Sequence, residues 1–354
     1  MLTRVIGGVF AILLWGDLAF AQAQRVSLYN WPDYFPQSVI DIFEQQTSIK
    51  VDIFDYASDE EKDAVLYATQ AKSHDIFVTS QFRLPNYIAS DWLAQVPKDK
   101  LPNLKHVDPK WLDTENANYC VPYLWGTLGI LYRKDRVKTP PTSWNDFFQP
   151  DETLKSSIGM IKDSRDVIGM ALLSLGFTLN ETRMYAFRQV ERRLAEFDEY
   201  VADFQILELS EKSQIIQGNW AMSMAYNGDA QVLQSLNDQL KFVLPKEGTA
   251  IWMDCFAVNH EAAKKPIVWE FLNYIHQPKV AAKIADSLKF ATTNKSAEQF
   301  LSASFKRNPV IYPSQAIMNR STVYKSLPTN ARLQLQRLYS NLMYRVQRNQ
   351  QSKM

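Results

Sequence analysis

Trp252 and Asp254 stand two positions apart at the start of the apolar run of residues 251–258. Side chains alternate between the two faces of an extended strand, so this indole and this carboxylate would point in the same direction. An aromatic face attracts an organic cation, and a carboxylate beside it adds charge and hydrogen-bond acceptors. A core tryptophan next to a capping aspartate is the simpler explanation of one such pair. The cation site becomes the better hypothesis because the same chemistry recurs along the chain.

Other carboxylates and rings fall where strands are predicted to end or helices to begin. Asp163 and Asp166 have the spacing of a helix N-cap and its third residue, and Asp229 follows Asn-Gly as a turn residue would. Each of these therefore also has a purely structural explanation. The candidate binding residues that share the pattern are Trp31, Asp33, Tyr34, Ser80, Phe82, Asp163, Asp166, Tyr226, Asp229, Trp252, Asp254 and Phe290.

Clustered carboxylates need a cation, because like charges close together are unfavourable and raise one another's pKa values. An alkyl diamine fits such a site, since the rings would flank its methylene chain and the carboxylates would bind its ammonium ends. A hard metal ion would want oxygen ligands without ring walls. A hydrolase that uses paired carboxylates beside an aromatic sugar platform is the alternative. The sequence has no G-x-S-x-G or H-E-x-x-H motif, its four histidines are scattered, and no cofactor is expected.

The elements that must position these residues begin with an alternation of strands and helices. Residues 26–30, 49–53 and 75–78 have the pattern of strands, and the helices between them begin near Pro36 and at the capping box Ser58-x-x-Glu61. This β-α-β-α-β order predicts a doubly wound parallel sheet, in which ligands bind outside the carboxyl ends of the strands. The long apolar stretch 121–132 predicts a strand between two domains, and residues 256–258 should carry the chain back.

The second region repeats the alternation, so the fold class is α/β with two doubly wound domains joined by a strand hinge. Its elements are strands at 158–161, 221–225 and 242–244 and helices at 167–174, 184–197 and 210–217. Further helices are predicted at 267–275, 278–288 and 331–346. The domains are expected to comprise residues 22–127 with 254–300, and 128–253 with 301–354.

Composition and the N-terminus indicate an exported protein. The 354 residues carry a formal net charge of +1 without a basic tract, which argues against a nucleic-acid partner. Arg4, the apolar residues 5–15 and the small-x-small site ending at Ala21 read as a signal peptide, giving a mature start near Gln22. No later stretch is long and apolar enough for a membrane span. Of the two cysteines, Cys120 and Cys255, free buried thiols are the favoured interpretation, and a disulfide stays open because both flank strands expected to be neighbours.

The chain resembles the periplasmic polyamine-binding proteins of ABC importers, the spermidine- and putrescine-binding receptors, over nearly its whole mature length. The resemblance rests on YNWPDY at 29–34, VPYLWG at 121–126, DSRD at 163–166, NG at 227–228 and PKEG at 245–248 leading to WMD at 252–254. It implies the type II periplasmic-binding-protein architecture, in which two α/β domains close on the ligand, and delivery to an inner-membrane ABC permease. Presentation of the polyamine to a membrane signalling receptor is the alternative.

The resemblance also implies roles for single residues. Trp31 and Trp252 match ring walls, while Asp33 and Asp254 match carboxylates that bind amines. Asp163 and Asp166 match an acidic pair of spermidine-preferring members, and Asp229 matches an acid of putrescine-preferring members. The positions that line the first domain's side are Tyr34, Ser80 and Phe82.

Four departures from the family pattern stand out. Pro32 replaces a hydroxyl residue, Tyr226 replaces a usual tryptophan, Phe290 replaces a common tyrosine, and Asp166 is one methylene shorter than the usual glutamate. Because the chain combines features of spermidine-preferring and of putrescine-preferring members, the sequence leaves the length of the ligand open.

Overall fold

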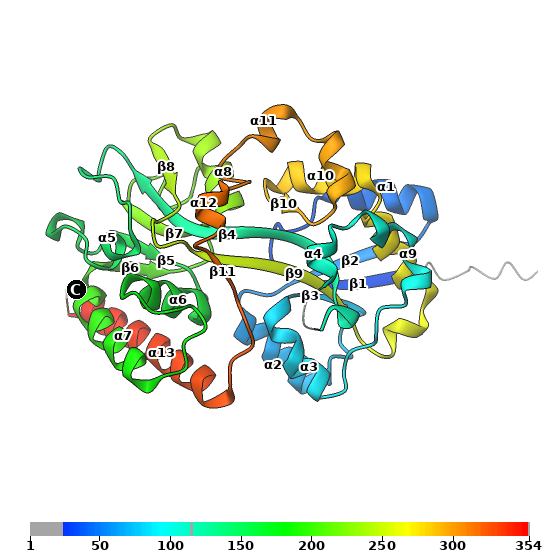
Figure 1. Cartoon of the computed structure of the whole chain (residues 1–354), viewed down its shortest axis with the longest axis horizontal. Helices are drawn as coiled ribbons and strands as arrows, with labels where there is room; N and C mark the ends of the chain where they lie inside the picture. Colours follow the sequence, from blue (N-terminus) through cyan, green and yellow to red (C-terminus); the bar gives the residue numbers. More distant parts are fainter. Residues whose placement is uncertain (1–23, 114–115, 353–354) are drawn as a thin grey trace, which may run out of the picture.

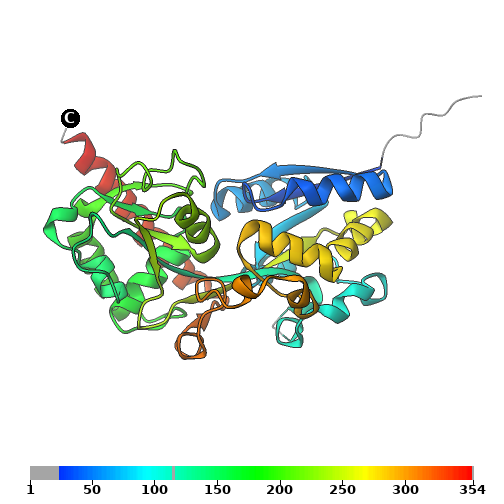
Figure 2. The ribbon, with the colours of Figure 1, turned by 90° about the horizontal axis from the view of Figure 1, so that it is seen from above.

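Two lobes lie along the long axis of the molecule, joined by long strands that run through both (Figure 1). The computed structural model describes residues 24–113 and 116–352, so the predicted signal peptide lies outside the described residues. Figure 2 shows the same two bodies from above, with the crossing strands between them. Within the described ranges the strands form a continuous sheet with the order β2-β1-β3-β9-β4-β7-β5-β6.

The first lobe opens with the predicted β-α-β-α-β unit. Its strands β1 (Arg25–Asn30), β2 (Lys50–Asp55) and β3 (Ile76–Ser80) are parallel, with β1 in the middle. Helix α1 (Gln37–Thr47) buries Val39, Ile40 and Phe43. Helix α2 (Asp59–Thr69) begins at Ser58, whose hydroxyl accepts a hydrogen bond from the backbone N–H of Glu61 at 3.0 Å, as the capping box predicts.

The second lobe is built on three parallel strands. Strand β5 (Ile158–Met160) lies between β6 (Val201–Phe204) and β7 (Met222–Tyr226). Helix α6 (Ser164–Ser174) follows β5, and α8 (Asn227–Leu236) follows β7. The other helices of this lobe are α5 (Trp144–Phe148), α7 (Met184–Phe197) and α13 (Thr329–Gln351). Both helix starts therefore lie at carboxyl ends of strands, where the doubly wound layout places ligand sites.

Two antiparallel strands, β4 (Val121–Arg133) and β9 (Ala250–Val258), connect the lobes. In the first lobe β9 pairs with β3, and β4 pairs with β10 (Ala291–Thr292). In the second lobe β4 pairs with β7 and with β8 (Leu240–Val243). The short β11 (Thr322–Val323) runs parallel to the start of β9 and forms a third crossing. The remaining α-helices are α3 (Leu84–Ala89), α4 (Pro109–Leu112), α9 (Pro266–Ile275), α10 (Pro278–Leu288), α11 (Ala303–Lys306) and α12 (Gln315–Met318).

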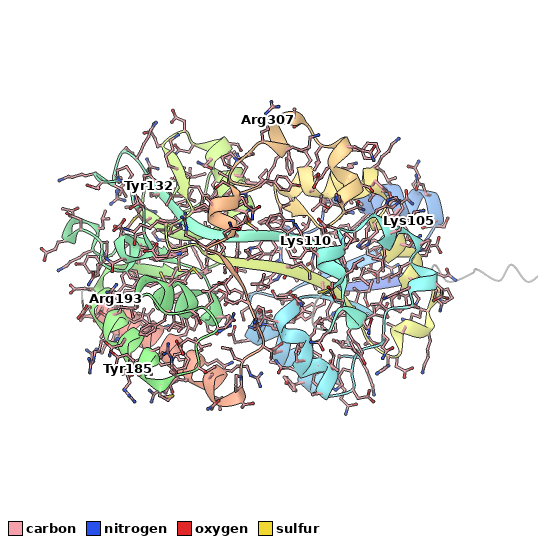
Figure 3. All side chains as sticks on the ribbon, in the orientation of Figure 1. Lys105, Lys110, Tyr132, Tyr185, Arg193 and Arg307 are labelled. Carbon is pink, nitrogen blue, oxygen red and sulfur yellow. A yellow bond between two sulfur atoms is a disulfide. The ribbon has the colours of Figure 1, made fainter. Side chains whose placement is uncertain are left out.

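Separate hydrophobic cores stabilise the lobes. The first core draws on residues 26–125 and 251–311, and the second on residues 128–250 and 324–346. Apolar side chains as far as Ile311 pack in the first core, so this core extends past the expected boundary at residue 300. We retain the division into two discontinuous domains as a proposal. Figure 3 shows the side chains over both lobes, with Lys105 and Tyr185 exposed at opposite ends.

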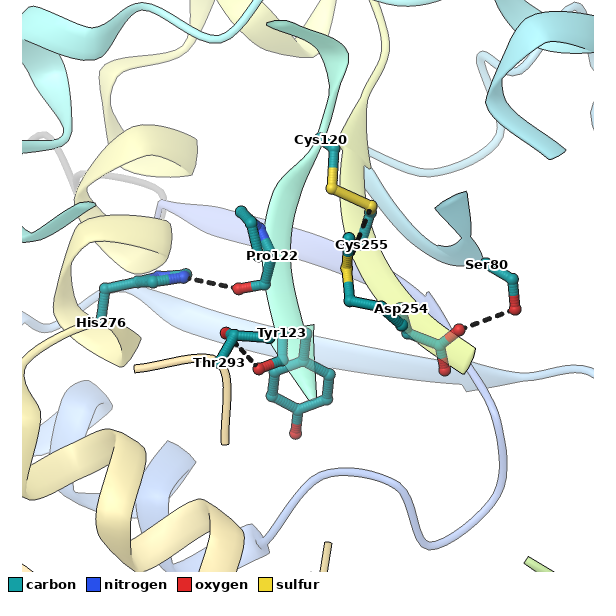
Figure 4. Close-up of a disulfide and its surroundings, with 9 residues drawn as sticks. Ser80, Cys120, Pro122, Tyr123, Asp254, Cys255, His276 and Thr293 are labelled. Atoms are coloured by element: carbon teal, nitrogen blue, oxygen red, sulfur yellow. Dashed lines mark hydrogen bonds between the residues drawn. A yellow bond between two sulfur atoms is a disulfide. The ribbon is translucent and has the colours of Figure 1, made fainter. Parts of the chain in front are cut away.

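The expectation of two free thiols is wrong, because Cys120 and Cys255 form a disulfide (Figure 4). Their Cα atoms are 5.1 Å apart, within the range that a disulfide needs. The bond joins the chain at the start of β4 to β9, where Cys255 lies opposite Pro122. The pairing of β4 with β9 brings together two cysteines that are 135 residues apart in the sequence. The sequence alone indicated only that the two strands were neighbours.

The predicted helix at 210–217 is also wrong, since this segment forms turns. Ile215 is buried there beside Trp220 in a small apolar cluster. A helix of eight residues has little stability of its own unless an apolar face packs against the protein. The packing of one isoleucine therefore outweighs the local preference of this segment for a helix. None of the helices in the described ranges is both long enough and apolar enough to cross a bilayer.

Candidate ligand-binding site

A cavity of about 140 Å³ lies between the two lobes. On this measure a water molecule needs roughly 10–15 Å³, so the space would hold about ten waters or a small organic molecule. All twelve residues that the sequence singled out line this cavity. They come from strand ends and helix starts of both lobes, which explains how positions as distant in sequence as Trp31 and Phe290 meet. Their role in binding is a proposal taken up below.

Asp254 lines the cavity from β9. It pairs with Ser80 of β3, and the Ser80 hydroxyl donates a hydrogen bond to Oδ1 of Asp254 at 2.8 Å (Figure 4). Burial raises the pKa of Asp254 to about 6, and the Ser80 hydrogen bond opposes that rise. The buried hydroxyl of Tyr34 makes no hydrogen bond of normal geometry within the described residues, although the Asp254 carboxylate adds to the burial that raises the pKa of Tyr34.

Asp229 faces the same cavity from the first turn of α8. Burial raises its pKa to about 7, and no cation contributes to that shift. Three rings stand near it. The Trp252 ring lies edge-to-face against Phe290, with centroids 5.1 Å apart, and edge-to-face against Tyr226 at 5.9 Å. Burial disfavours the ionised form of this carboxyl group. A ligand cation bound beside it would stabilise the ionised form, and the neighbouring aromatic rings would add cation–π attraction.

Asp163 and Asp166 form a second carboxylate pair at the start of α6. Asp163 is the N-cap, and its Oδ1 accepts a hydrogen bond from the Asp166 N–H at 2.8 Å, so the capping explanation of this spacing is correct. Asp166 accepts hydrogen bonds from the hydroxyls of Tyr226, at 2.7 Å, and Tyr324. Burial raises the pKa of both carboxyls, and for Asp163 the neighbouring Asp166 adds to the rise.

Trp31 and Asp33 form the rim of the cavity after β1. Asp33 is exposed and has a φ of 54°, a left-handed conformation that aspartate tolerates in tight turns. The Trp31 ring packs against Tyr56, with centroids 4.5 Å apart. Asp33 also raises the pKa of Asp55, although burial of Asp55 is the larger cause. Negative charge is therefore present at the entrance as well as inside.

Comparison with known protein families identifies the family of this chain. The family model described as "Bacterial extracellular solute-binding protein" matches residues 38–312. The chain belongs to this family. It is 29% identical over 296 residues to a spermidine/putrescine-binding periplasmic protein of Salmonella typhimurium, covering 82% of this chain and 84% of the relative. It is 26% identical over 300 residues to a norspermidine sensor of Vibrio cholerae, covering 84% and 83%.

A solved structure agrees on the fold of this solute-binding protein. It is described as a spermidine/putrescine ABC transporter of Listeria monocytogenes, superposes with a TM-score of 0.83, and is 29% identical. The match covers 91% of this chain and 99% of that one. The architecture predicted from the sequence, two α/β lobes of the type II periplasmic-binding-protein kind, is thus confirmed.

Contacts across the cleft show that the lobes of this solute-binding protein are closed upon each other. The Ser164 hydroxyl of α6 donates a hydrogen bond to Oε1 of Glu60 in α2 at 3.1 Å. Phe82, which follows β3, packs against Tyr324 of the second core, with centroids 5.2 Å apart. Gly228 of α8 approaches Phe290 so closely that a Cβ atom there would lie 2.5 Å from the ring.

Sequence reasoning missed a buried charge network that reaches the cavity wall. Asp59 lines the cavity and binds the ammonium of Lys62 and the guanidinium of Arg83, the latter at 2.6 Å. Lys62 is fully buried and also donates to Thr79 Oγ1 at 3.0 Å. In the sequence Asp59 looks like an ordinary first-turn acid of α2. Nothing local distinguishes it, because the pairing with Arg83 arises only in the folded chain.

The cavity also has walls that the sequence did not indicate, Tyr324 and the apolar residues Ile206, Leu207 and Leu209. The apolar segment follows β6, next to Gln205, whose N–H donates to the Met160 carbonyl of β5 at 3.0 Å. This hydrogen bond brings the apolar segment beside the start of α6, which follows β5. No group of three or more residues able to hold a metal ion occurs in the described ranges.

Proposed function

We propose that this protein is a polyamine receptor that binds a linear aliphatic amine in the cavity between its lobes. One observation carries the proposal: Asp254 and Asp229 are desolvated beside Trp252 and Phe290, and neither carboxylate forms an ion pair with a lysine or arginine of the described residues. Burying a carboxylate without a partner is costly, and a ligand ammonium would remove that cost. The rings supply cation–π attraction and cover methylene groups.

The roles we propose follow from position in the cavity. Asp254 and Asp229 bind one ammonium group, and Asp33 attracts the ligand at the rim. Trp31, Trp252 and Phe290 form ring walls, and Ser80 holds Asp254 in place through its hydrogen bond. Tyr34 lines the same end, and Phe82 packs where the lobes meet. Asp163 offers an oxygen for the other end of the ligand.

We further propose that the protein works in the periplasm after removal of a signal peptide near Ala21, and delivers its ligand to an ABC permease in the inner membrane. The spermidine/putrescine-binding relative supports this transport role. A second candidate is presentation of the ligand to a membrane signalling receptor, which the similarity to a norspermidine sensor favours. Co-purification of the ligand-loaded protein with a permease or with a signalling receptor distinguishes the two.

Calorimetric titration tests the binding function. The mature protein is unfolded and refolded to remove bound amine, then titrated with putrescine, cadaverine, spermidine and spermine. Saturable binding with one amine per protein is expected. Absence of heat and of any thermal shift with every amine would contradict the proposal and favour the carboxylate hydrolase, which a glycoside turnover assay would then detect.

A further inference from the structure

Each carboxylate oxygen of Asp166 accepts a hydrogen bond from a phenol group of the protein. The Tyr226 hydroxyl, at the end of β7, donates to Oδ2 at 2.7 Å, and the Tyr324 hydroxyl donates to Oδ1. Asp166 is 5% exposed, so it is also largely shielded from solvent. Hydrogen bonds from hydroxyls to a carboxylate are short and strong. Each oxygen of the carboxylate therefore already has a strong donor from the protein, which reduces its need for a ligand ammonium group.

The phenol of Tyr324 is held in place by its neighbours. The Arg165 guanidinium lies over the Tyr324 ring, 4.8 Å from the centroid, and 5.8 Å from the centroid of Phe82. Asn180 Oδ1 accepts a hydrogen bond from Arg165 at 2.8 Å. Phe82 packs against Tyr324 from the opposite lobe. Because Arg165 and Phe82 both contact the ring, Tyr324 cannot turn away from Asp166 without breaking these contacts.

The two ends of the cavity consequently differ in what they offer a ligand. At one end, Oδ1 of Asp254 accepts the Ser80 hydrogen bond, and Asp229 accepts none among the interactions of the described residues. At the other end, Asp163 uses Oδ1 for the Asp166 N–H, which leaves one oxygen, and Arg83 lies close enough to lower its pKa against the larger effect of burial. The apolar Ile206, Leu207 and Leu209 complete the wall.

We propose that Asp166 is a structural acceptor rather than a ligand carboxylate in this chain, and that Tyr226 and Tyr324, by occupying it, make the cavity select a linear diamine over a triamine. This inference rests on the proposed polyamine function. A diamine places one ammonium at Asp254 and Asp229 and the other at Asp163. A triamine carries a third ammonium group into the closed cavity, where the remaining buried carboxylates already have partners: Asp59 is paired with Lys62 and Arg83, and Asp166 with the two phenols. Desolvating a cation without an acceptor is unfavourable.

The test compares affinities for diamines and triamines in wild-type protein and in phenol-to-phenyl variants. Putrescine and cadaverine serve as diamines, and norspermidine and spermidine as triamines, each measured by calorimetry on refolded, amine-free protein. The wild type is expected to bind the better diamine at least tenfold more tightly than either triamine. Tyr226→Phe combined with Tyr324→Phe frees both oxygens of Asp166 and should raise the triamine-to-diamine affinity ratio at least tenfold.

Tyr185→Phe is the matched control, because Tyr185 is 59% exposed on α7, outside the cavity (Figure 3). It should leave the ratio unchanged. Thermal unfolding checks that each variant folds. If the double variant does not fold, Tyr226→Phe alone is used, since Tyr226 is only partly buried and its loss frees one oxygen. That single change should still raise the ratio about threefold.

Two outcomes would overturn the inference while leaving the polyamine function intact. One is a wild-type preference for a triamine, and the other is an unchanged triamine-to-diamine ratio in the folded Tyr→Phe variant. Failure of every amine to bind any of these proteins would instead overturn the polyamine function, and this inference with it.

Discussion

The Ser80 hydroxyl donates a hydrogen bond to Oδ1 of Asp254 at 2.8 Å, although the two residues are 174 positions apart in the sequence. They are directly opposite each other in the antiparallel pairing of β3 with β9. The contact fixes one oxygen of a carboxylate that lines the cavity. The strand that crosses between the lobes thus also carries the carboxylate to which we assign the central binding role.

The disulfide between Cys120 and Cys255 should stabilise the folded protein. Closing a loop of this length restricts the unfolded chain, and removal of a native disulfide typically costs about 2–5 kcal/mol. Urea unfolding with and without dithiothreitol measures the free energy of unfolding. A Cys120→Ala/Cys255→Ala variant should show no response to the reductant. Equal stability of the oxidised and reduced wild type would contradict the assignment.

Ligand affinity should fall as the pH is lowered. The pKa of Asp254 is raised to about 6 and that of Asp229 to about 7, so each is protonated below those values and no longer attracts an ammonium group. Between pH 8 and pH 5 the affinity for putrescine should decrease about tenfold or more, since a tenfold change corresponds to one pKa unit. Asp229→Asn should flatten the upper part of this profile. An affinity for putrescine that stays constant over this pH range would disagree with buried carboxylates whose pKa values are raised.

The stability of the ligand-free protein should have the opposite pH dependence. A carboxyl group whose pKa is raised by folding binds its proton more tightly in the folded than in the unfolded chain. The free energy of unfolding therefore decreases as the pH rises from about 4, the pKa in the unfolded chain, to the pKa in the folded protein. For Asp229 this window ends near pH 7. Urea unfolding at several pH values checks the slope, and Asp229→Asn should reduce it.

Gly228 should be required for closure of the lobes. A Cβ at this position would lie 2.5 Å from a ring atom of Phe290, which belongs to the other lobe. Gly228→Ala should therefore weaken ligand binding by about 1–3 kcal/mol, roughly 5- to 150-fold, as overpacking usually does. Small-angle scattering of the ligand-saturated variant should show a larger radius of gyration than the wild type. Adding Phe290→Leu should recover part of the closure, and a fully closed Gly228→Ala protein would refute this role of the contact.

The hydrogen bond from Ser164 to Glu60 should favour the closed state modestly. It joins α6 to α2 at 3.1 Å in a partly buried position. A net contribution of about 0.5–1.5 kcal/mol predicts that Ser164→Ala binds ligand two- to tenfold more weakly. The melting temperature of the ligand-free protein should stay unchanged, because the bond joins the lobes and lies outside both cores. A variant with wild-type affinity would show that this bond adds nothing to closure.

The fold was largely predictable because hydrophobic periodicity and capping signals are local. The strands around Leu28 and Val78 and the helix 184–197 follow from the spacing of apolar residues alone. At Asp229 the sequence favours a turn, because Asn-Gly is a turn signal, whereas the structure has a helix stabilised by packing of Ala230 and Leu233. Tertiary contacts outweigh the local preference at that point.

The residues that line the site could be predicted from the sequence, but the contacts among side chains in and around it could not. Carboxylates and rings at strand ends identified the lining, since a doubly wound layout brings those ends together. Three relationships could not be read from the sequence: Arg83 binding Asp59, the Cys120–Cys255 bond, and the two phenols on Asp166. Each joins residues from separate elements, and only the folded chain brings them into contact.

Titration of an Asp254→Ala variant with putrescine tests the central claim most directly. Removing one partner of a buried charge pair costs about 3–5 kcal/mol, so the affinity should fall by two to more than three orders of magnitude. Asp99→Ala, a change of the same kind at an exposed residue outside the cavity, should bind putrescine as the wild type does. If folded Asp254→Ala protein binds putrescine with unchanged affinity, the cavity between the lobes is not the amine site and the proposed binding function of that cavity is wrong.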